Sequence, residues 1–221
     1  MPKSSNDRDA AEGRAQPQQS RSQETWNAIL EAAATLFDSH GYEPTTTHQI
    51  AAQAGVSVGA LYRYFDGKEA VLKELYRRES SSLRERALAE FSIADLLSRD
   101  VAALLRKTLA LAFRVYRERP GLRRVFAEQS RKIPELIEVR RALEGDVHTA
   151  VHQIFAAAPG IRVPDIEVGA YLATVFLEAL MDDFLLYPTE HPDFGDERVI
   201  AAATDFVLRY ALGRIDPTPT P

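Results

Sequence analysis

The stretch "TTTHQIAAQAGVSVGALYRYF", residues 45–65, decides the fold of the N-terminal part of this chain. It contains two short segments in which apolar side chains recur at helical spacing, and Gly55 separates them. Thr46 with Gln49 forms a capping-box pattern and Ser57 is a favourable N-cap residue, so each segment predicts the start of a short helix. Two short helices joined by a glycine-containing turn and supported by a preceding helix indicate a helix-turn-helix.

The residue types inside this stretch match the packing needs of such a unit. Ala51 is small where the two helices approach each other closely, and Leu61 is apolar where the second helix must face the core. Gly55 supplies the left-handed turn conformation without a Cβ clash. Ile50 and Phe65 are also expected in the core and not at a binding surface.

Helical periodicity extends over most of the remaining chain. Apolar side chains between Trp26 and Phe37 follow the i, i+3, i+4 pattern of one helix face. Ser20 with Gln23 is a possible capping box for this first helix, and Gly41 is a favourable stop. Strand-like alternation is absent from the sequence, so we predict an all-α fold of about nine helices. The later helices are expected over residues 66–91, 100–119, 122–130, 134–157, 165–186 and 196–213.

Composition narrows the class of protein. Of 221 residues, 45% are apolar and 27% are charged, which is typical of a globular protein. The chain has no cysteine, which excludes disulfides and thiolate metal sites and favours a reducing compartment. No segment has the pattern of a secretory signal or a membrane span, so we expect a cytoplasmic protein without a membrane partner. A net charge of −5 excludes a nonspecific nucleic-acid coat and is compatible only with a local DNA-binding surface.

The helix-turn-helix stretch also carries a family resemblance. Together with "ILEAAATLFDSHGY" before it and "DGKEAVL" after it, it resembles the N-terminal domain of the TetR (tetracycline-repressor) family of transcriptional regulators. The pattern Thr-Thr, Ile-Ala, Ala-Gly-Val-Ser, Leu-Tyr-x-Tyr-Phe and Lys-Glu matches that family nearly continuously from about residue 22 to 75. The later helices match only in number, length and order. The resemblance implies a dimeric, ligand-responsive DNA-binding regulator that acts as a repressor, and not an enzyme.

The resemblance implies DNA contacts residue by residue. Residues 57–60 would face base edges in the major groove, and Gly59 would let the backbone approach closely. Tyr62 and Tyr64 would donate their hydroxyls to phosphates, while Thr46 and Lys68 would hold phosphates at two helix N-termini. The expected contact set is Thr46, Thr47, His48, Ser57, Val58, Gly59, Ala60, Tyr62, Arg63, Tyr64 and Lys68, with simple solvent exposure as the alternative for His48 and Arg63.

The resemblance further implies a homodimer formed by the last two helices and a small-molecule effector bound among the helices before them. The segment over residues 165–186 is apolar nearly all round, which indicates burial on several sides. Glu178, Asp182 and Asp183 interrupt it and either orient a polar or cationic ligand or form salt bridges. The candidate pocket lining is Phe113, Tyr116, Phe126, Tyr171, Phe176, Glu178 and Met181, with ordinary core packing as the alternative for each.

Other functional classes find little support in the sequence. Glu144, His148 and His152 share one helix stripe, but three ligands spread over two turns cannot reach one ion unless a second helix helps. We therefore interpret them as a polar stripe and expect no metal and no other cofactor. The alternatives that remain are a regulator whose ligand is a protein or absent, and an all-α enzyme or small-molecule carrier that contains a similar hairpin without binding DNA.

These expectations divide the chain into four parts. Residues 1–20 contain no large apolar side chain after Met1 and are expected to form a disordered arm, as is the tail over residues 215–221. Residues 21–67 are expected to form the DNA-binding domain, and residues 68–214 the ligand-binding and dimerisation domain. A twofold dimer would present two recognition helices to double-stranded DNA, so the expected operator is pseudo-palindromic.

Overall fold

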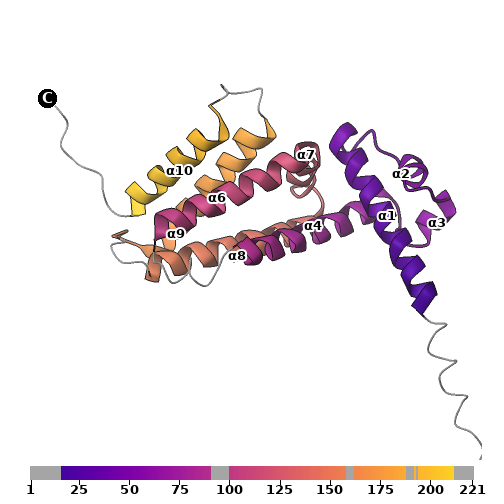
Figure 1. The fold of residues 1–221 in the computed structure, drawn as a ribbon, viewed down its shortest axis with the longest axis horizontal. Coiled ribbons are helices and arrows are strands. Elements are labelled where there is room, and N and C mark those ends of the chain that lie inside the picture. The colour runs from indigo at the N-terminus through magenta and orange to yellow at the C-terminus, as the bar shows by residue number, and fades with distance from the viewer. Residues whose placement is uncertain (1–15, 91–99, 158–161, 188–191, 193, 212–221) are drawn as a thin grey trace, which may run out of the picture. The chain divides into compact units, whose positions relative to one another are not determined.

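A computed structural model describes residues 16–211, apart from 91–99, 158–161, 188–191 and 193. Within these residues the chain forms nine α-helices and one π-helical segment, and no strand (Figure 1). The all-α prediction is confirmed. The elements are α1 (Gln16–His40), α2 (Thr47–Gln53), α3 (Val58–Tyr62), α4 (Lys68–Glu90), α6 (Val101–Glu118), α7 (Pro120–Gln129), α8 (Pro134–Ala157), α9 (Ile166–Leu180), the π-helical segment η1 (Met181–Leu185) and α10 (Asp196–Ala211).

The chain divides into two compact units, which meet between Leu75 and Tyr76 inside α4. The boundary expected after residue 67 lies at the start of the same helix. The helix α1 begins at Gln16, so residues 16–20 of the expected arm are helical and the pattern at Ser20 and Gln23 does not begin the helix. An established helix extends readily through residues such as glutamine and arginine, because propagation costs far less than nucleation. Residues 1–15 and the expected tail lie outside the described residues.

The first unit depends on burial, because α2 and α3 are too short to be stable alone. They contain seven and five residues, whereas isolated helices below about 12–15 residues are marginal in water. Ile50 of α2 and Leu61 of α3 are fully buried, as are Ile29 and Phe37 of α1. Burying such a side chain contributes about 1.5–3 kcal/mol. The apolar residues predicted for the core therefore hold the two short helices on α1.

Two N-caps begin the short helices as the sequence predicts. The Thr46 hydroxyl accepts a hydrogen bond from the Gln49 amide at 3.2 Å, and the Thr46 amide donates to Gln49 Oε1 at 2.8 Å. This completes the capping box. The Ser57 hydroxyl accepts from the Ala60 amide at 3.1 Å and begins α3. Both caps satisfy amides that would otherwise lack a partner at a helix start.

Gly55 makes the turn between the two short helices. Its φ of 69° lies in the left-handed region, where a side chain would be strained. The neighbouring Val56 amide bonds back to the Ala51 carbonyl at 3.0 Å, so the chain reverses tightly after α2. Gly59, by contrast, has ordinary helical geometry, and a Cβ added there would meet no atom within 4 Å.

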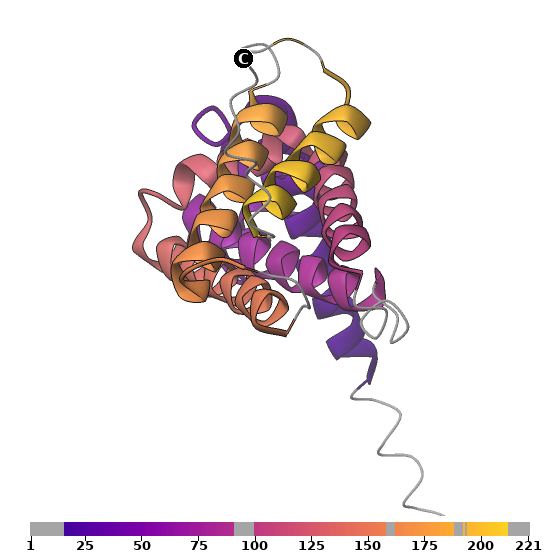
Figure 2. The same cartoon turned by 90° about the vertical axis from the view of Figure 1, so that its left-hand side faces the viewer.

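The second unit is a helical bundle with two apolar clusters. In one cluster α6, η1 and α10 contribute Leu109, Phe113, Phe184, Leu185 and Ala203. The other cluster joins the end of α8 to α9 and α10 through Phe155, Ala170, Ala173, Val207 and Ala211. Figure 2 faces α9 and α10, which run side by side on one face of this unit. This arrangement buries one side of α9 and α10 and leaves their opposite sides outward.

The helix predicted over residues 165–186 differs in its last part. The α-helix α9 ends at Leu180 and continues into η1, where the backbone is π-helical. Phe184, Leu185 and Leu186 are all buried, at 5%, 1% and 1% exposed. Three successive side chains cannot point to one side of a regular α-helix, so the wider π-turn brings more of them into the core.

Substitutions at Gly55 and Gly59 should have opposite effects on stability. Gly55→Ala places a Cβ in the left-handed region and is expected to lower the free energy of unfolding by about 1–2 kcal/mol. Gly59→Ala replaces a helical glycine in open space and is expected to raise it by about 0.5–1 kcal/mol. Thermal unfolding followed by circular dichroism measures both changes. Equal effects of the two variants would contradict the assigned backbone conformations.

Candidate DNA-binding interface

The exposed side of α3 presents the residues expected at base edges. Leu61 is fully buried and fixes which side of the helix faces inward. Ser57, Gly59 and Arg63 are exposed, while Val58 and Ala60 are half-buried. Tyr62 is 52% exposed, which is unusual for so large a ring. The start of α3 is therefore an outward surface, as a recognition helix requires.

Gly59 is the residue in this surface that folding does not explain. Its backbone needs no positive φ, and no neighbouring side chain competes for the space of a Cβ. A glycine inside a helix costs about 0.5–1 kcal/mol relative to alanine. The physical advantage that remains is a backbone that another molecule can approach closely at the first turn of α3.

The two tyrosines of the motif have different surroundings. The Tyr62 hydroxyl lies 3.3 Å from the Thr47 hydroxyl, and the ring otherwise extends into solvent. Tyr64 is half-buried, and its ring meets Trp26 edge-on at 6.2 Å between centroids. The Tyr64 hydroxyl lies 3.3 Å from that of Ser22. Both hydroxyls remain at the surface, but only Tyr64 also packs in the first unit.

Lys68 has a structural role that the sequence did not indicate. Its ammonium group donates to the carbonyl oxygens of Tyr42 at 2.7 Å and Glu43 at 3.2 Å. It also lies 4.2 Å from the centroid of the Tyr42 ring, in cation–π geometry. Lys68 thus ties the start of α4 to the connection between α1 and α2. The phosphate contact expected of it stays a prediction that must use the remaining donor of the same ammonium group.

The start of α2 carries the other residues expected at phosphates. Thr46 and His48 are exposed and Thr47 is half-buried. The Thr46 hydroxyl accepts from the Gln49 amide and also lies 3.0 Å from Gln49 Oε1, so the cap already uses this group. A phosphate at this end would meet backbone amides and the Thr47 hydroxyl first. The expected DNA contacts thus lie at the starts of α2 and α3 and in the segment up to Lys68.

Four of the seven residues expected to line an effector pocket pack together in one apolar cluster: Phe113, Tyr116, Phe176 and Met181. Phe126 is buried against Tyr76 at 4.7 Å between ring centroids. Burial raises the pKa of the half-buried Tyr116 to about 12. Phe176 and Glu178 are half-buried on α9. Helical spacing alone did not distinguish a pocket wall from the packed interior.

Tyr171 is placed on the outside of the second unit. It is 58% exposed on α9, and its interpretation as pocket lining is not supported by this position. The neighbouring apolar side chains are also outward, and together they form a band across α9 and α10. We call this band the α9–α10 apolar face; its members are Val168, Tyr171, Leu172, Val175 and Phe206, each at least 41% exposed.

Two grooves lie on the same face. Phe176 and Phe206 line both of them, and their rings stack with 4.5 Å between centroids. The larger groove continues past Phe194 and Arg198, with a volume of about 560 Å³. Both grooves are open to solvent along the outward side of α9 and α10, as is expected of a helix surface that no partner covers.

The polar stripe of α8 contains no arrangement suited to a metal. Glu144 pairs with Arg140, and the rings of His148 and His152 are 6.4 Å apart. Among the residues that the structure describes, no group of three histidine, aspartate or glutamate side chains could hold an ion. No helix in the described part of the chain is long and apolar enough to cross a membrane.

Two models of known protein families match the sequence of this chain. The family model described as "Bacterial regulatory proteins, tetR family" matches residues 29–75, which include α2 and α3. The family model described as "Tetracyclin repressor-like, C-terminal domain" matches residues 100–210 and covers the second unit from α6 to α10. The two models together account for both units of the structure.

Individual relatives agree with these matches. The A-factor receptor protein of Streptomyces griseus is 38% identical over 65 residues, which are 29% of this chain and 24% of that protein. The HTH-type transcriptional repressor KstR2 of Rhodococcus jostii is 45% identical over 49 residues, 22% of this chain and 24% of the repressor. The chain thus spans about a quarter of the length of these curated relatives.

A solved structure extends the likeness to the whole fold. A transcriptional regulator from Rhodococcus sp. Rha1 superposes with a TM-score of 0.66 at 22% identity, over 86% of this chain and 97% of that one. At this identity the likeness concerns the fold, which includes both the helix-turn-helix and the helical bundle. Together with the two family models, it shows that the chain belongs to the TetR family of bacterial regulatory proteins.

Proposed function

We propose that this chain is a sequence-specific DNA-binding transcriptional regulator that acts as a dimeric, ligand-responsive repressor. The observation that carries the proposal is the outward start of α3, where Gly59 leaves the backbone open and Tyr62 stands exposed. The family and the names of the relatives are those of transcriptional regulators, which supports the proposal. In this proposal residues 21–67 read DNA, and residues 68–214 bind the effector and the second subunit.

The proposed DNA contacts fall into two kinds, those to base edges and those to phosphates. Ser57, Gly59 and the half-buried side chains beside them meet base edges, which carry the sequence information. Tyr62, Tyr64 and the amides at the start of α2 meet phosphates, which set the register. An overall charge of −5 provides little long-range attraction to DNA. Affinity therefore depends on the close contact of two recognition helices, one from each subunit, with a pseudo-palindromic operator.

The α9–α10 apolar face supports the proposed homodimer. A contiguous apolar patch on a globular protein marks an interaction site, and Tyr171 and Phe206 are the large aromatic residues that anchor such interfaces. The face comes from the last two helices, from which the family resemblance implies a four-helix interface. A twofold partner would cover Phe206 and the grooves beside it on both subunits at once.

The carboxyl groups of α9 and η1 support a polar or cationic effector. Burial raises the pKa of Glu178, and the negative charges of Glu144 and Asp182 add to this effect. Burial also raises the pKa of Asp182, although Arg131 pairs with it at 3.1 Å. Burial makes the ionised forms of these two carboxyl groups unfavourable, and a bound cation or hydrogen-bond donor would stabilise them. Such a ligand would favour the helix packing in which it binds best. Such a population shift would alter the distance between the recognition helices of the two subunits.

DNA binding tests the proposed function. The full chain should bind DNA from upstream of its own gene selectively in a gel-shift assay. Gly59→Ala should weaken this binding at least about tenfold, equivalent to 1.4 kcal/mol, because the new methyl group prevents close approach to the groove.

Gly145→Ala is the matched control for that variant. Gly145 is an exposed helical glycine in the other unit, and a Cβ there also meets nothing within 4 Å. This substitution should raise stability in the same way and leave DNA affinity unchanged. Absence of selective binding by the wild-type chain, or equal effects of the two variants, would argue for a protein that does not read DNA through α3.

Self-association should depend on the α9–α10 apolar face. Phe206→Glu places a charge in the proposed interface and should weaken dimerisation at least about tenfold in sedimentation velocity, since burying an unpaired charge is costly. Val147→Glu makes the same kind of change at a side chain that is 46% exposed on α8, and should have no effect. A wild-type monomer at all concentrations would contradict the dimer.

The raised pKa of Glu178 makes a prediction about pH. A carboxyl group whose pKa is raised by folding contributes stability below its unfolded pKa and loses it as the pH rises through its folded pKa. Glu178→Gln should therefore raise the unfolding temperature at pH 7, and the gain should shrink towards pH 4. The control is Glu118→Gln, where the Arg86 hydrogen bond lowers the pKa of Glu118, so the change at pH 7 should have the opposite sign.

A further inference from the structure

The second half of α4 is attached to its unit in an unusual way. Val71, Leu72, Leu75 and Tyr76 are buried, but none of the described side chains over residues 77–90 is. Apolar burial supplies most of the stability with which helices pack, and the described side chains of this half of α4 supply little of it. Another kind of contact therefore contributes to its position in the second unit.

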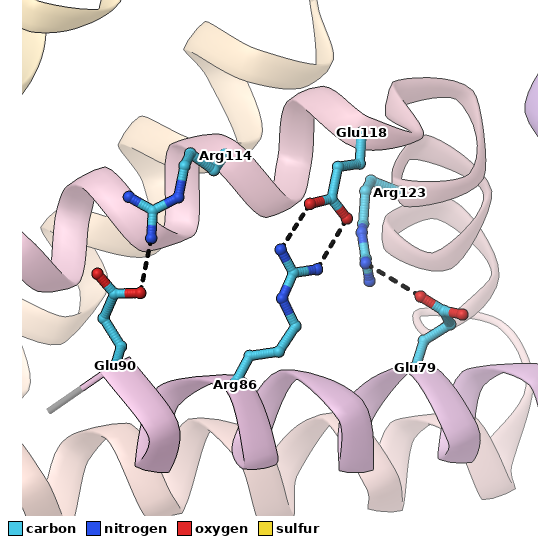
Figure 3. Close-up of polar contacts among 6 residues, drawn as sticks. All are labelled: Glu79, Arg86, Glu90, Arg114, Glu118 and Arg123. Carbon is cyan, nitrogen blue, oxygen red and sulfur yellow. Dashed lines mark hydrogen bonds and ion pairs between the residues drawn. The ribbon is translucent and has the colours of Figure 1, made fainter.

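Ion pairs to other helices provide that contact, and Figure 3 shows three of them on one side of α4. Glu79 lies 3.2 Å from an Arg123 nitrogen on α7. Arg86 donates two hydrogen bonds to Glu118 on α6, at 2.7 and 2.5 Å. Glu90 accepts from Arg114 of α6 at 2.8 Å. We call these three pairs the α4 ion-pair ladder.

The ladder alternates in sign on both sides. Along α4 the charges are negative, positive and negative, and the facing charges on α6 and α7 are positive, negative and positive. Arg86 and Glu90 are one turn apart, as are Arg114 and Glu118. If α4 slid by one turn against α6, Arg86 would face Arg114 or Glu90 would face Glu118. Only one register of α4 therefore pairs every charge.

Each pair of the ladder is weak on its own, and the three pairs hold α4 because they act together. An exposed ion pair contributes at most about 1 kcal/mol, and the side chains of Glu118 and Arg114 are 50% and 52% exposed. Arg86 and Glu118 form a two-pronged pair, and Glu79 and Arg123 are less exposed, at 19% and 12%. Such contacts weaken as salt shortens the range of charge interactions, whereas apolar packing does not.

We propose that the α4 ion-pair ladder is an ionic latch that holds the second half of α4 in one register and opens when its charges are screened or reversed. In this device, α4 can move while the apolar clusters of α6, η1 and α10 stay packed. The regulatory consequence rests on the proposed function: α4 begins at Lys68 in the unit that carries α2 and α3, so an open latch frees the helix through which an effector would act.

Hydrogen exchange of the full chain, read by mass spectrometry on peptides within residues 77–90, tests the latch without DNA or effector. Raising the salt from about 0.05 M to about 0.5 M should speed exchange several-fold in these peptides and much less in α6 and α10. Arg86→Glu should speed it at least about tenfold at low salt and reduce the acceleration caused by salt, because salt then also screens the new repulsion with Glu118. The double variant Arg86→Glu with Glu118→Arg restores an opposite-charge pair and should return exchange to within about threefold of wild type.

Two further variants make the result decisive. Arg209→Glu breaks an exposed ion pair within α10, between Arg209 and Asp205, and should leave exchange over residues 77–90 unchanged. If Arg86→Glu does not fold, Arg86→Met keeps most of the apolar stem and removes the charge, and it should give the same direction of change. Salt-independent exchange in wild type, or a double variant no better protected than the single one, would overturn the latch. Neither result would alter the DNA-binding test, which is read in a separate assay.

Discussion

The whole N-terminal unit depends on one packing constraint: two helices too short to stand alone must bury one side each. Ile50 and Leu61 are the side chains that meet this requirement, and the left-handed turn at Gly55 lets both face inward at the same time. Once Leu61 is inside, helical geometry places Gly59 and Tyr62 on the outside. The surface proposed to read DNA is therefore the geometric complement of the core, and folding and recognition share one helix of five residues.

In the second unit, apolar side chains are divided between the interior and an outward face, where we propose that a second subunit binds. The apolar clusters of this unit take one side of α9 and α10, and the α9–α10 apolar face is what remains. The half of α4 over residues 77–90 belongs to neither set. It is joined to α6 and α7 by paired charges, which fix direction and register well and contribute modest free energy. In this bundle, apolar packing holds the interior together, and paired charges hold the second half of α4 against it.

The sequence predicted the helices and the local motif closely, and it predicted long-range contacts poorly. Caps, glycine turns and periodicity are local, so Thr46, Ser57 and Gly55 could be assigned correctly. Whether Tyr171 faces the interior or a partner depends on where α10 packs, and that is a tertiary property. Lys68 was expected at phosphate alone, because nothing in the sequence brings its ammonium group to the Tyr42 carbonyl. The charges of α4 were also visible, but their pairing required the positions of α6 and α7.

The π-helical segment η1 has a consequence for comparing this chain with its relatives. A π-turn closes its hydrogen bonds over one more residue than an α-turn, so it accommodates one additional residue within a helix. The helix continues after η1 only to Leu186, which is buried. An alignment with a protein whose equivalent helix is regular should therefore open a one-residue gap within Met181–Leu185, and not in the loop that follows. A gap placed in that loop would pair the residues that follow the π-turn, such as Leu186, with the wrong positions of the relative.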